Sequence, residues 1–251
     1  MLDVDDAWGR RRLAWLRRKA TAAGKDRPGV VWLSGFNSVM GSSKASALDA
    51  WAEPKGRALT RFDYSGHGQS DGRLDQGCIG QWLADARAAF EQLTQGPQIV
   101  VGSSMGGYLA LLLALARPGR LAGLVLIAPA WNMTERLMWD EMPPQTRTIL
   151  KRDGVWMRPS AYGAPYPITR KLIEEGREHL IDLFNLDLSC PLRILHGAKD
   201  ADVPFDGSVD LIRAQRDTDS RLIAVPDGDH RLAREQDIAL LIRLIEDLDE
   251  V

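Results

Sequence analysis

A serine framed by glycines is the residue in this sequence best suited to covalent chemistry. Ser104 lies in Gly102-Ser103-Ser104-Met105-Gly106-Gly107, which fits the pattern G-x-S-x-G. An apolar run precedes the motif and a long apolar stretch follows it, which is the strand, sharp turn and helix that such a nucleophile requires. Side chains two residues either side of the serine would collide in this turn, so glycine is needed at both positions. We therefore predict that Ser104 is a catalytic nucleophile.

A second match to the same pattern shows how little the motif means without its surroundings. Gly68-Gln69-Ser70-Asp71-Gly72 also fits, but polar residues flank it and no apolar helix opens there. We therefore do not expect Ser70 to be a nucleophile. The alternative interpretation of Ser104, a hydroxyl that caps a helix, leaves the paired glycines without a reason.

A serine hydroxyl needs a base that removes its proton during attack. The sequence offers four histidines. His230 lies in a loop between the last predicted strand and the final helix, where the base falls when the chain order is serine, acid, histidine. We predict that His230 is the base. The other three are expected in structural roles: His67 in a glycine-rich loop, His196 ordering a turn at a strand end, and His179 on a solvated helix face.

The acid partner of the base must lie between Ser104 and His230 in the sequence. Asp200 and Asp202 both follow a predicted strand, Leu192 to Leu195. Asp200 comes where the turn leaves the strand and is favoured, whereas Asp202 would lie deeper in the turn and reads as a solvated carboxylate. Asp200 would accept the second ring N–H of His230, fix its tautomer and stabilise the imidazolium.

The negative charge that develops on a substrate carbonyl oxygen needs two backbone donors. One is the N–H of Met105, the residue after the nucleophile, and the other comes from the loop after an early strand. We predict that Phe36 supplies it, from Ser34-Gly35-Phe36-Asn37, where Gly35 lets the backbone approach closely. No histidine and carboxylate spacing resembles a metal site and no glycine-rich phosphate loop opens a helix, so neither a metal nor another cofactor is expected.

The elements that must position these residues alternate between short apolar runs and helical patterns. This alternation predicts an α/β fold with a mostly parallel sheet covered by helices on both faces. Helices are predicted over Ile79 to Leu93, over Met105 to Ala116, and around an apolar stripe from Ile238 to Leu248. The predicted strands are Val30–Leu33, Ala58–Phe62, Ile99–Val101, Leu124–Ile127, Leu192–Leu195 and Leu222–Val225.

One long region interrupts the alternation. Residues 131–189 contain no strand of the core type and are rich in proline, so we predict a cap of helices and loops inserted in a single domain over residues 1–251. Seven large side chains between Trp131 and Met157 are methionine or tryptophan. We expect most to pack the cap onto the body, and Trp131 and Met138 to bind substrate. The segment from Arg11 to Leu16 fits an edge strand or an amphipathic helix.

Composition narrows the class of protein. The chain has 251 residues, 45% hydrophobic and 26% charged, which is typical of a soluble globular protein. Its net charge of −2 provides no basic field for nucleic acid. The longest apolar stretches are well short of a membrane span. Acidic residues near Met1 differ from a leader peptide, so a cytoplasmic location is expected. Cys78 and Cys190 are expected as buried thiols, and the sequence leaves the oligomeric state open.

With these residues in hand, the chain resembles the α/β-hydrolases. It is most similar to the α/β-hydrolase domain-containing subfamily ten, the mitochondrial palmitoyl-protein thioesterase and acyl-glucuronide esterase group. The resemblance covers nearly the whole chain after the N-terminal segment. It rests on Arg61–Gly66, Gly96–Gly107, Gly154-Val155-Trp156, His196-Gly197 with Lys199-Asp200, Asp229-His230-Arg231 and the Asp237 to Leu248 helix. It implies a serine hydrolase with Ser104, Asp200 and His230 that acts on acyl thioesters or activated esters.

The leading hypothesis is therefore a cofactor-free serine hydrolase that forms an acyl-enzyme. Its partner would be a small or protein-linked acyl ester or thioester. One alternative is a non-catalytic binding protein that kept the fold, although a binder has no need of a full triad. Another is an acyltransferase, which would share every residue and differ only in what reaches the acyl-enzyme.

Overall fold

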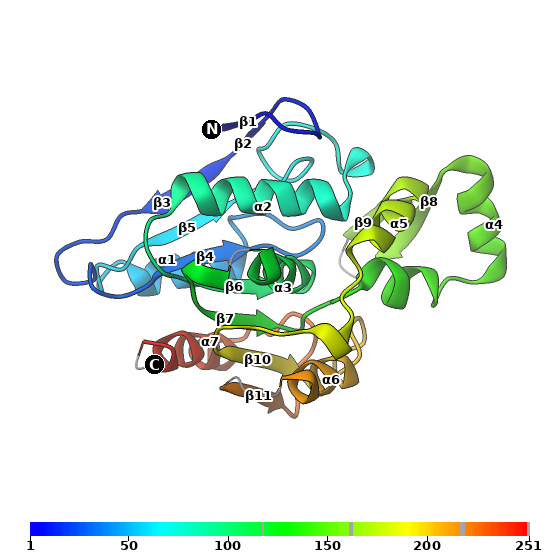
Figure 1. Ribbon diagram of the computed structural model, residues 1–251. Coiled ribbons are helices and arrows are strands. Elements are labelled where there is room, and N and C mark those ends of the chain that lie inside the picture. Colours follow the sequence, from blue (N-terminus) through cyan, green and yellow to red (C-terminus); the bar gives the residue numbers. More distant parts are fainter. Residues whose placement is uncertain (117, 161–162, 216–218, 250–251) are drawn as a thin grey trace.

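A seven-stranded sheet forms the centre of the protein (Figure 1). The computed structural model describes residues 1–116, 118–160, 163–215 and 219–249. Neighbouring strands are parallel except β3 and β5, which are antiparallel. In spatial order the strands are β11 (Ser220–Val225), β10 (Leu192–Gly197), β7 (Leu121–Ile127), β6 (Gln98–Ser103), β4 (Gly29–Leu33), β5 (Leu59–Phe62) and β3 (Trp15–Arg18).

Alternate side chains of the central strands enter two separate apolar clusters. Val31 and Leu33 of β4 pack in the cluster of α2 (Ile79–Leu93), α3 (Met105–Ala116) and α6 (Asp206–Ala214). Val30 and Trp32 pack in the cluster of α1 (Ser43–Ala52) and α7 (Glu235–Asp247) on the other face. Because both faces are buried, the central strands β4, β6 and β7 are apolar along most of their length. The predicted fold class is confirmed, with α2 and α3 at their predicted bounds.

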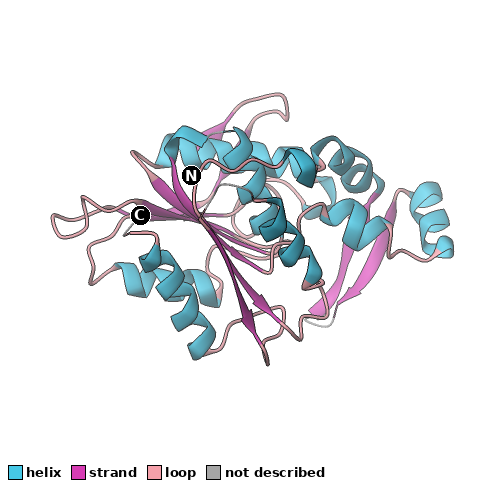
Figure 2. Cartoon of the chain, turned by 60° about the horizontal axis from the view of Figure 1, so that its bottom comes forward, coloured by secondary structure: helices cyan, strands magenta, loops and turns pink. Residues whose placement is uncertain are grey.

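The inserted region extends beyond the carboxyl ends of the parallel strands (Figures 1 and 2). It follows β7 and returns to β10, so it lies over the edge of the sheet that carries Ser104. Its buried side chains, including Met133, Met138 and Ile168, continue the α2 and α3 cluster. Its elements are η3 (Thr134–Trp139), α4 (Pro144–Asp153), β8 (Val155–Ser160), β9 (Gly163–Thr169), α5 (Arg170–Gly176), η4 (Arg177–His179) and η5 (Leu183–Asn185).

The prediction that this region contains only helices and loops was wrong. Strands β8 and β9 pair as an antiparallel hairpin, with Arg158 opposite Tyr166. Prolines at 159, 165 and 167 argued against strands, but a two-stranded ribbon has only edges, where a missing N–H is tolerated. Side chains of β8 alternate between exposed and half-buried, so one face of the hairpin lies against the body.

The N-terminal segment adopts the strand alternative. β1 (Leu2–Val4) and β2 (Arg11–Leu13) form a small antiparallel sheet, and β3 adds an edge to the main sheet. Arg11 is buried and its guanidinium contacts Asp85 of α2 and Asp6, each at 2.7 Å. This ion-paired anchor fixes the segment to the body.

Two short 3₁₀ helices lie outside the inserted region. They are η1 (Leu74–Gln76) and η2 (Pro118–Arg120). Cys78 and Cys190 are buried free thiols, as predicted. In the part of the chain that the structure describes, no helix has the length and apolar character needed to cross a membrane.

Candidate active site

Ser104 occupies the turn between β6 and α3 in a strained backbone conformation. Its φ is +55°, a left-handed value that costs a non-glycine residue about 1–3 kcal/mol unless its surroundings enforce it. The end of β7 supplies that enforcement. The Ser104 N–H donates to the Ile127 carbonyl at 2.8 Å, and the Ala130 N–H donates to the Ser104 carbonyl at 3.1 Å. The turn therefore holds the serine side chain in place from both sides.

The two glycines of the motif leave the space that the sequence predicts. A Cβ atom at Gly102 would lie 2.3 Å from the Gly106 carbonyl oxygen, and one at Gly106 would lie 2.0 Å from the Leu33 carbonyl oxygen. Both contacts are with backbone, which cannot move aside cheaply. The motif thus lets β6, α3 and the loop after β4 approach one another around the serine.

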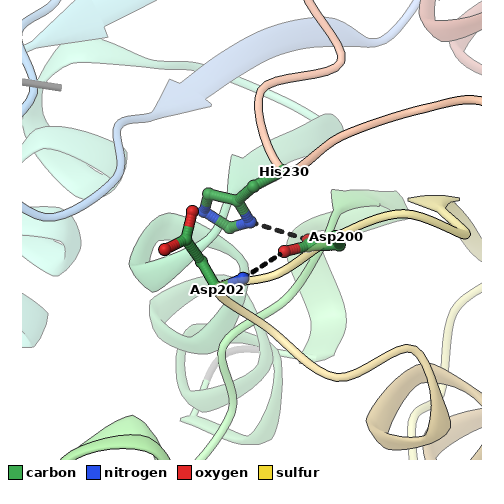
Figure 3. A group of neighbouring side chains, drawn as sticks. All are labelled: Asp200, Asp202 and His230. Carbon is green, nitrogen blue, oxygen red and sulfur yellow. Dashed lines mark hydrogen bonds and ion pairs between the residues drawn. The ribbon is translucent and has the colours of Figure 1, made fainter. Parts of the chain in front are cut away.

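The structure brings Ser104, His230 and Asp200 together. The Nε2 atom of His230 lies 3.2 Å from the Ser104 hydroxyl oxygen. Its Nδ1 atom lies 2.7 Å from Oδ2 of Asp200 (Figure 3). Because the Asp200 carboxylate accepts the Nδ1 proton, Nε2 is left as the atom that can take a proton from the serine.

Backbone hydrogen bonds join the loops that carry His230 and Asp200. The Lys199 N–H donates to the Gly228 carbonyl at 2.9 Å, which ties the end of β10 to the loop after β11. A Cβ at Gly197 would lie 2.4 Å from the Gly228 carbonyl oxygen, so glycine is needed where these loops cross. The Asp229 carboxylate accepts the N–H groups of Arg231 and Leu232 and shapes the histidine loop.

The Asp200 carboxylate is completely buried and has four partners. Its Oδ1 accepts the N–H groups of Asp202 and Val203, both at 2.8 Å. Its Oδ2 contacts His230 and, at 3.2 Å, Nε2 of His196. Burial opposes ionisation, but the hydrogen bonds from His196 and His230 outweigh it and hold the pKa of Asp200 below its ordinary value. The acid therefore stays charged, as support of an imidazolium requires.

His196 does more than order a turn. Its ring is fully buried, with Nδ1 at 2.7 Å from the Ser208 hydroxyl and Nε2 at 3.1 Å from the Val203 carbonyl. A carbonyl can only accept, so Nε2 carries the proton that also faces Asp200. The histidine and glycine that end β10 are a weak sequence signal, because the partners of the ring come from later segments.

His67 lies in the glycine-rich loop, as expected, whereas His179 differs from its expected setting. His67 is buried, and its Nε2 accepts the Asn37 N–H at 3.1 Å, while burial lowers its pKa. His179 is half-buried and contacts Glu175 at 2.7 Å instead of lying on a solvated face. Glu175 in turn accepts the N–H of Gly80 in the first turn of α2, so this pair joins the inserted region to the body.

The loop expected to bind the oxyanion lies against Ser104. A Cβ at Gly35 would lie 3.5 Å from Cβ of Ser104, which places this backbone next to the serine. Neither the Phe36 N–H nor the Met105 N–H donates to another group in the described part of the chain. Asn37 has a φ of +54° and is held by His67, so the loop is fixed just after Phe36.

Ser70, in the second match to the motif, has a structural setting. Its hydroxyl donates to the Asp63 carbonyl at 2.6 Å and accepts the Ala14 N–H at 2.9 Å. These bonds connect the loop after β5 to the N-terminal segment.

A cavity of about 220 Å³ opens above Ser104 and His230. Met138, Met133 and Leu137 of the inserted region line it, together with Phe36 and Ala130. Its polar lining includes Arg158 and Tyr166 of the hairpin, residues that helical periodicity could not place there.

Trp131, the other residue expected to bind substrate, is not among the described residues that line this cavity. Its indole N–H donates to the Gly207 carbonyl at 2.9 Å and the Arg136 guanidinium covers its ring at 3.7 Å. Trp131 packs the inserted region onto α6, so we do not retain it as a substrate contact.

Asp200, Asp202 and His230 could together suggest a metal site, since their donor atoms lie within 4.8 Å of one another. The Asp202 carboxylate lies on the opposite side of the His230 ring from Asp200 (Figure 3). Both oxygens of Asp200 already accept hydrogen bonds, and Nδ1 of His230 is one of the donors. These partners compete with a metal ion, so the three residues fit a hydrogen-bonded acid and base better than a ligand set.

Comparison with known proteins identifies the family. The model of the family described as serine aminopeptidase S33 matches residues 24–174. A Bos taurus protein, palmitoyl-protein thioesterase ABHD10, is 37% identical over 225 residues, which cover 88% of this chain and 72% of the relative. The chain belongs to the α/β-hydrolase family. The Homo sapiens protein of the same name is 35% identical over 223 residues, with the same shares of both chains.

Solved structures of two relatives share this arrangement of the chain. Mouse α/β-hydrolase domain-containing protein 10 superposes with a TM-score of 0.86 at 34% identity, covering 98% of this chain and 96% of that one. An Agrobacterium vitis S4 protein gives a TM-score of 0.91 at 36% identity, with 98% and 97% covered. The mammalian thioesterases are named as mitochondrial, so the cytoplasmic location of this hydrolase family member stays a prediction.

Proposed function

We propose that this protein is a serine esterase or thioesterase that cleaves acyl esters and thioesters through an acyl-enzyme. The observation that carries the proposal is the continuous contact from the Ser104 hydroxyl through His230 to a buried, charged Asp200. The names of the mammalian relatives, palmitoyl-protein thioesterases, support acyl thioesters as the substrate class.

Each proposed step follows from the position of a group. The Ser104 oxygen attacks the carbonyl carbon while its proton moves to Nε2 of His230. The N–H groups of Phe36 and Met105 receive the oxyanion at the positive end of α3. His230 then protonates the leaving sulfur or oxygen, and Asp200 stabilises the imidazolium throughout. Water, activated by the same histidine, releases the acyl group as a carboxylic acid.

The acyl chain is assigned to the cavity above Ser104. Methionine has a flexible, polarisable side chain that adapts to an unbranched chain, and Met133 and Met138 both line this space. Arg158 and Tyr166 form part of its polar wall.

Covalent labelling tests the proposal. A fluorophosphonate should modify Ser104, because its oxygen is next to a base and at the positive end of a helix. Ser70 serves as an internal control, since its hydroxyl is engaged with backbone groups. Intact-mass and peptide analysis of the wild type and Ser104→Ala would locate the adduct. An adduct on Ser70, or none on the wild type, would disprove both the nucleophile and the enzymatic function.

A further inference from the structure

Two cavities meet at the nucleophile. Besides the cavity of about 220 Å³ assigned to the acyl chain, a second one of about 340 Å³ also reaches Ser104 and His230. Phe36 and Asn37 border both. The far wall of the second cavity comes from the start of α1 and from the chain just after His230. A substrate whose carbonyl lies at Ser104 can therefore extend in two directions.

The two cavities differ in chemical character. Met133, Leu137 and Met138 give the first an apolar wall, and its charged residues, Asp202 and Arg158, have opposite signs. Among the described residues that line the second cavity, the cations are Lys44 and Arg231, and none is acidic. Its remaining polar lining is mostly hydroxyl and amide groups, contributed by Asn37, Ser38, Ser42, Ser43 and Ser103. An anion is the group that this lining solvates best.

Lys44 lines the same cavity as Ser104 and His230. It lies in the first turn of α1, and its ammonium donates to the Arg231 carbonyl, next to the base. One such bond leaves two N–H donors of the ammonium for a ligand. Burial lowers the pKa of Lys44 to about 8; the Arg231 charge acts in the same direction, and Asp229 and Asp237 oppose it. At pH 7 the side chain is therefore mostly a cation.

The start of α1 adds the Ser42 hydroxyl and the positive end of the helix to this lining. Ser42 is the N-cap residue, yet its side chain makes no capping hydrogen bond. Its hydroxyl oxygen is buried without a hydrogen-bond partner among the described residues. The first turn of α1 contains no acidic residue, so the positive end of this helix is not neutralised locally.

We propose that the second cavity binds the leaving group and selects alcohols and thiols that carry a carboxylate or a phosphate. The inference rests on the proposed function, and it assigns the two sides of the substrate. The acyl chain enters the methionine-lined cavity, the leaving atom lies at His230, and the anion lies toward Lys44 and Arg231.

The chemistry of the step is unchanged by this assignment. The bond from the carbonyl carbon to sulfur or oxygen breaks, and the acyl group is left on Ser104. The serine proton travels through Nε2 of His230 to the leaving atom. The leaving group departs with its thiol or hydroxyl protonated, and its carboxylate or phosphate is unchanged.

Matched substrates test the proposal. Octanoyl thioesters of 3-mercaptopropionate and 2-mercaptoethanol differ in charge but share the acyl group and the leaving atom. We expect the wild type to favour the carboxylate in kcat/KM by about tenfold or more, the scale of hydrogen bonds to charged groups. Octanoyl esters of glycerol 3-phosphate and of glycerol then show whether phosphate is favoured as well as carboxylate. Preference for either anion supports the proposal.

Three variants separate recognition from catalysis. Lys44→Gln and Arg231→Gln should lower kcat/KM for the anionic thioester toward the neutral value, and change the neutral thioester by less than about threefold. Lys199→Gln is the matched control, because Lys199 is an exposed lysine near the site that does not line the cavity. Raising the pH from 7 to 9 should weaken the preference for the anionic thioester, because Lys44 loses its proton and only Arg231 keeps its charge.

Failure of this inference is distinguishable from failure of the proposed function. Equal turnover of charged and neutral thioesters by the wild type would overturn the leaving-group assignment and leave the hydrolase intact. Equal effects of Lys44→Gln and Lys199→Gln would do the same. Absence of turnover together with an unlabelled Ser104 would overturn the proposed function, and the inference with it.

Discussion

Replacing Asp200 by asparagine is the sharpest test of the proposed triad. The carboxylate accepts four hydrogen bonds: two from the backbone N–H groups of Asp202 and Val203, and two from ring N–H groups of His230 and His196. An asparagine of the same shape has one oxygen and one NH₂ group, so it can accept on one side only. Either orientation of the amide sets donors against donors inside a fully buried site.

The orientation that keeps the two backbone hydrogen bonds predicts measurable losses of activity and stability. With its oxygen toward the backbone, the amide faces His230 with NH₂, so Nδ1 must accept and Nε2 must carry the proton. That tautomer cannot take the serine proton, and kcat should fall by about 10⁴-fold, the scale seen when a triad acid loses its charge. The amide also leaves His196 facing a donor, which should lower the free energy of unfolding by about 1–3 kcal/mol.

Kinetics and unfolding together check this reasoning. We would measure kcat with an octanoyl thioester, and stability by urea unfolding, for Asp200→Asn and for the neighbouring Asp202→Asn. The side chain of Asp202 is exposed, so its variant should lose less than about tenfold in kcat and little stability. A larger kcat loss for Asp202→Asn than for Asp200→Asn would show that the acid is misassigned.

Three further predictions concern the cavity and the two buried histidines. From acetyl to octanoyl thioesters, kcat/KM should rise about fourfold per methylene, which corresponds to ~0.8 kcal/mol each. Met138→Ala should flatten this rise more than Met142→Ala, the control, because Met142 is buried but does not line the cavity. His196→Phe should lower kcat and raise the apparent pKa of the acid, while His196→Gln, which keeps an N–H donor, should restore much of both in pH–rate profiles. Burial lowers the pKa of His67, so the free energy of unfolding should be highest above pH 6.5, the ordinary pKa of histidine. It should fall as the pH drops below 6.5 and through the lowered pKa of the folded protein, and His67→Gln should weaken this dependence in urea titrations.

The layered core was predictable because its signals are local. The predicted runs within β4, β6 and β7 are apolar and buried, as strands covered on both faces must be; they are Val30–Leu33, Ile99–Val101 and Leu124–Ile127. The apolar side chains of α2 repeat with helical spacing, and its predicted bounds, Ile79 to Leu93, are those observed. In such segments periodicity and burial agree, so the sequence alone is enough.

The hairpin and the buried histidines depend on contacts that sequence spacing does not reveal. Proline at position 165 argued against a strand in this segment. The strand is explained only by the pairing of β9 with β8. His67 reaches Asn37, thirty residues earlier, and His196 reaches Ser208 of α6. In each case the partner is brought near by the path of the chain around the sheet, so the role of the residue follows from topology.

The setting of Ser104 could be predicted from the sequence and that of Trp131 could not, and the reason is again the path of the chain. Strand ends place the serine, histidine and acid, because parallel strands deliver their carboxyl ends to one edge of the sheet, and chain order then limits the choices. Substrate contacts come instead from the inserted region, whose path no periodicity constrains. Trp131 and Met138 looked equivalent as large side chains in that region, yet one packs against Gly207 and the other lines the cavity. The chemistry of a hydrolase of this kind is therefore easier to read from its sequence than its specificity, and the specificity of this one has to be sought in the walls of the two cavities that meet at Ser104.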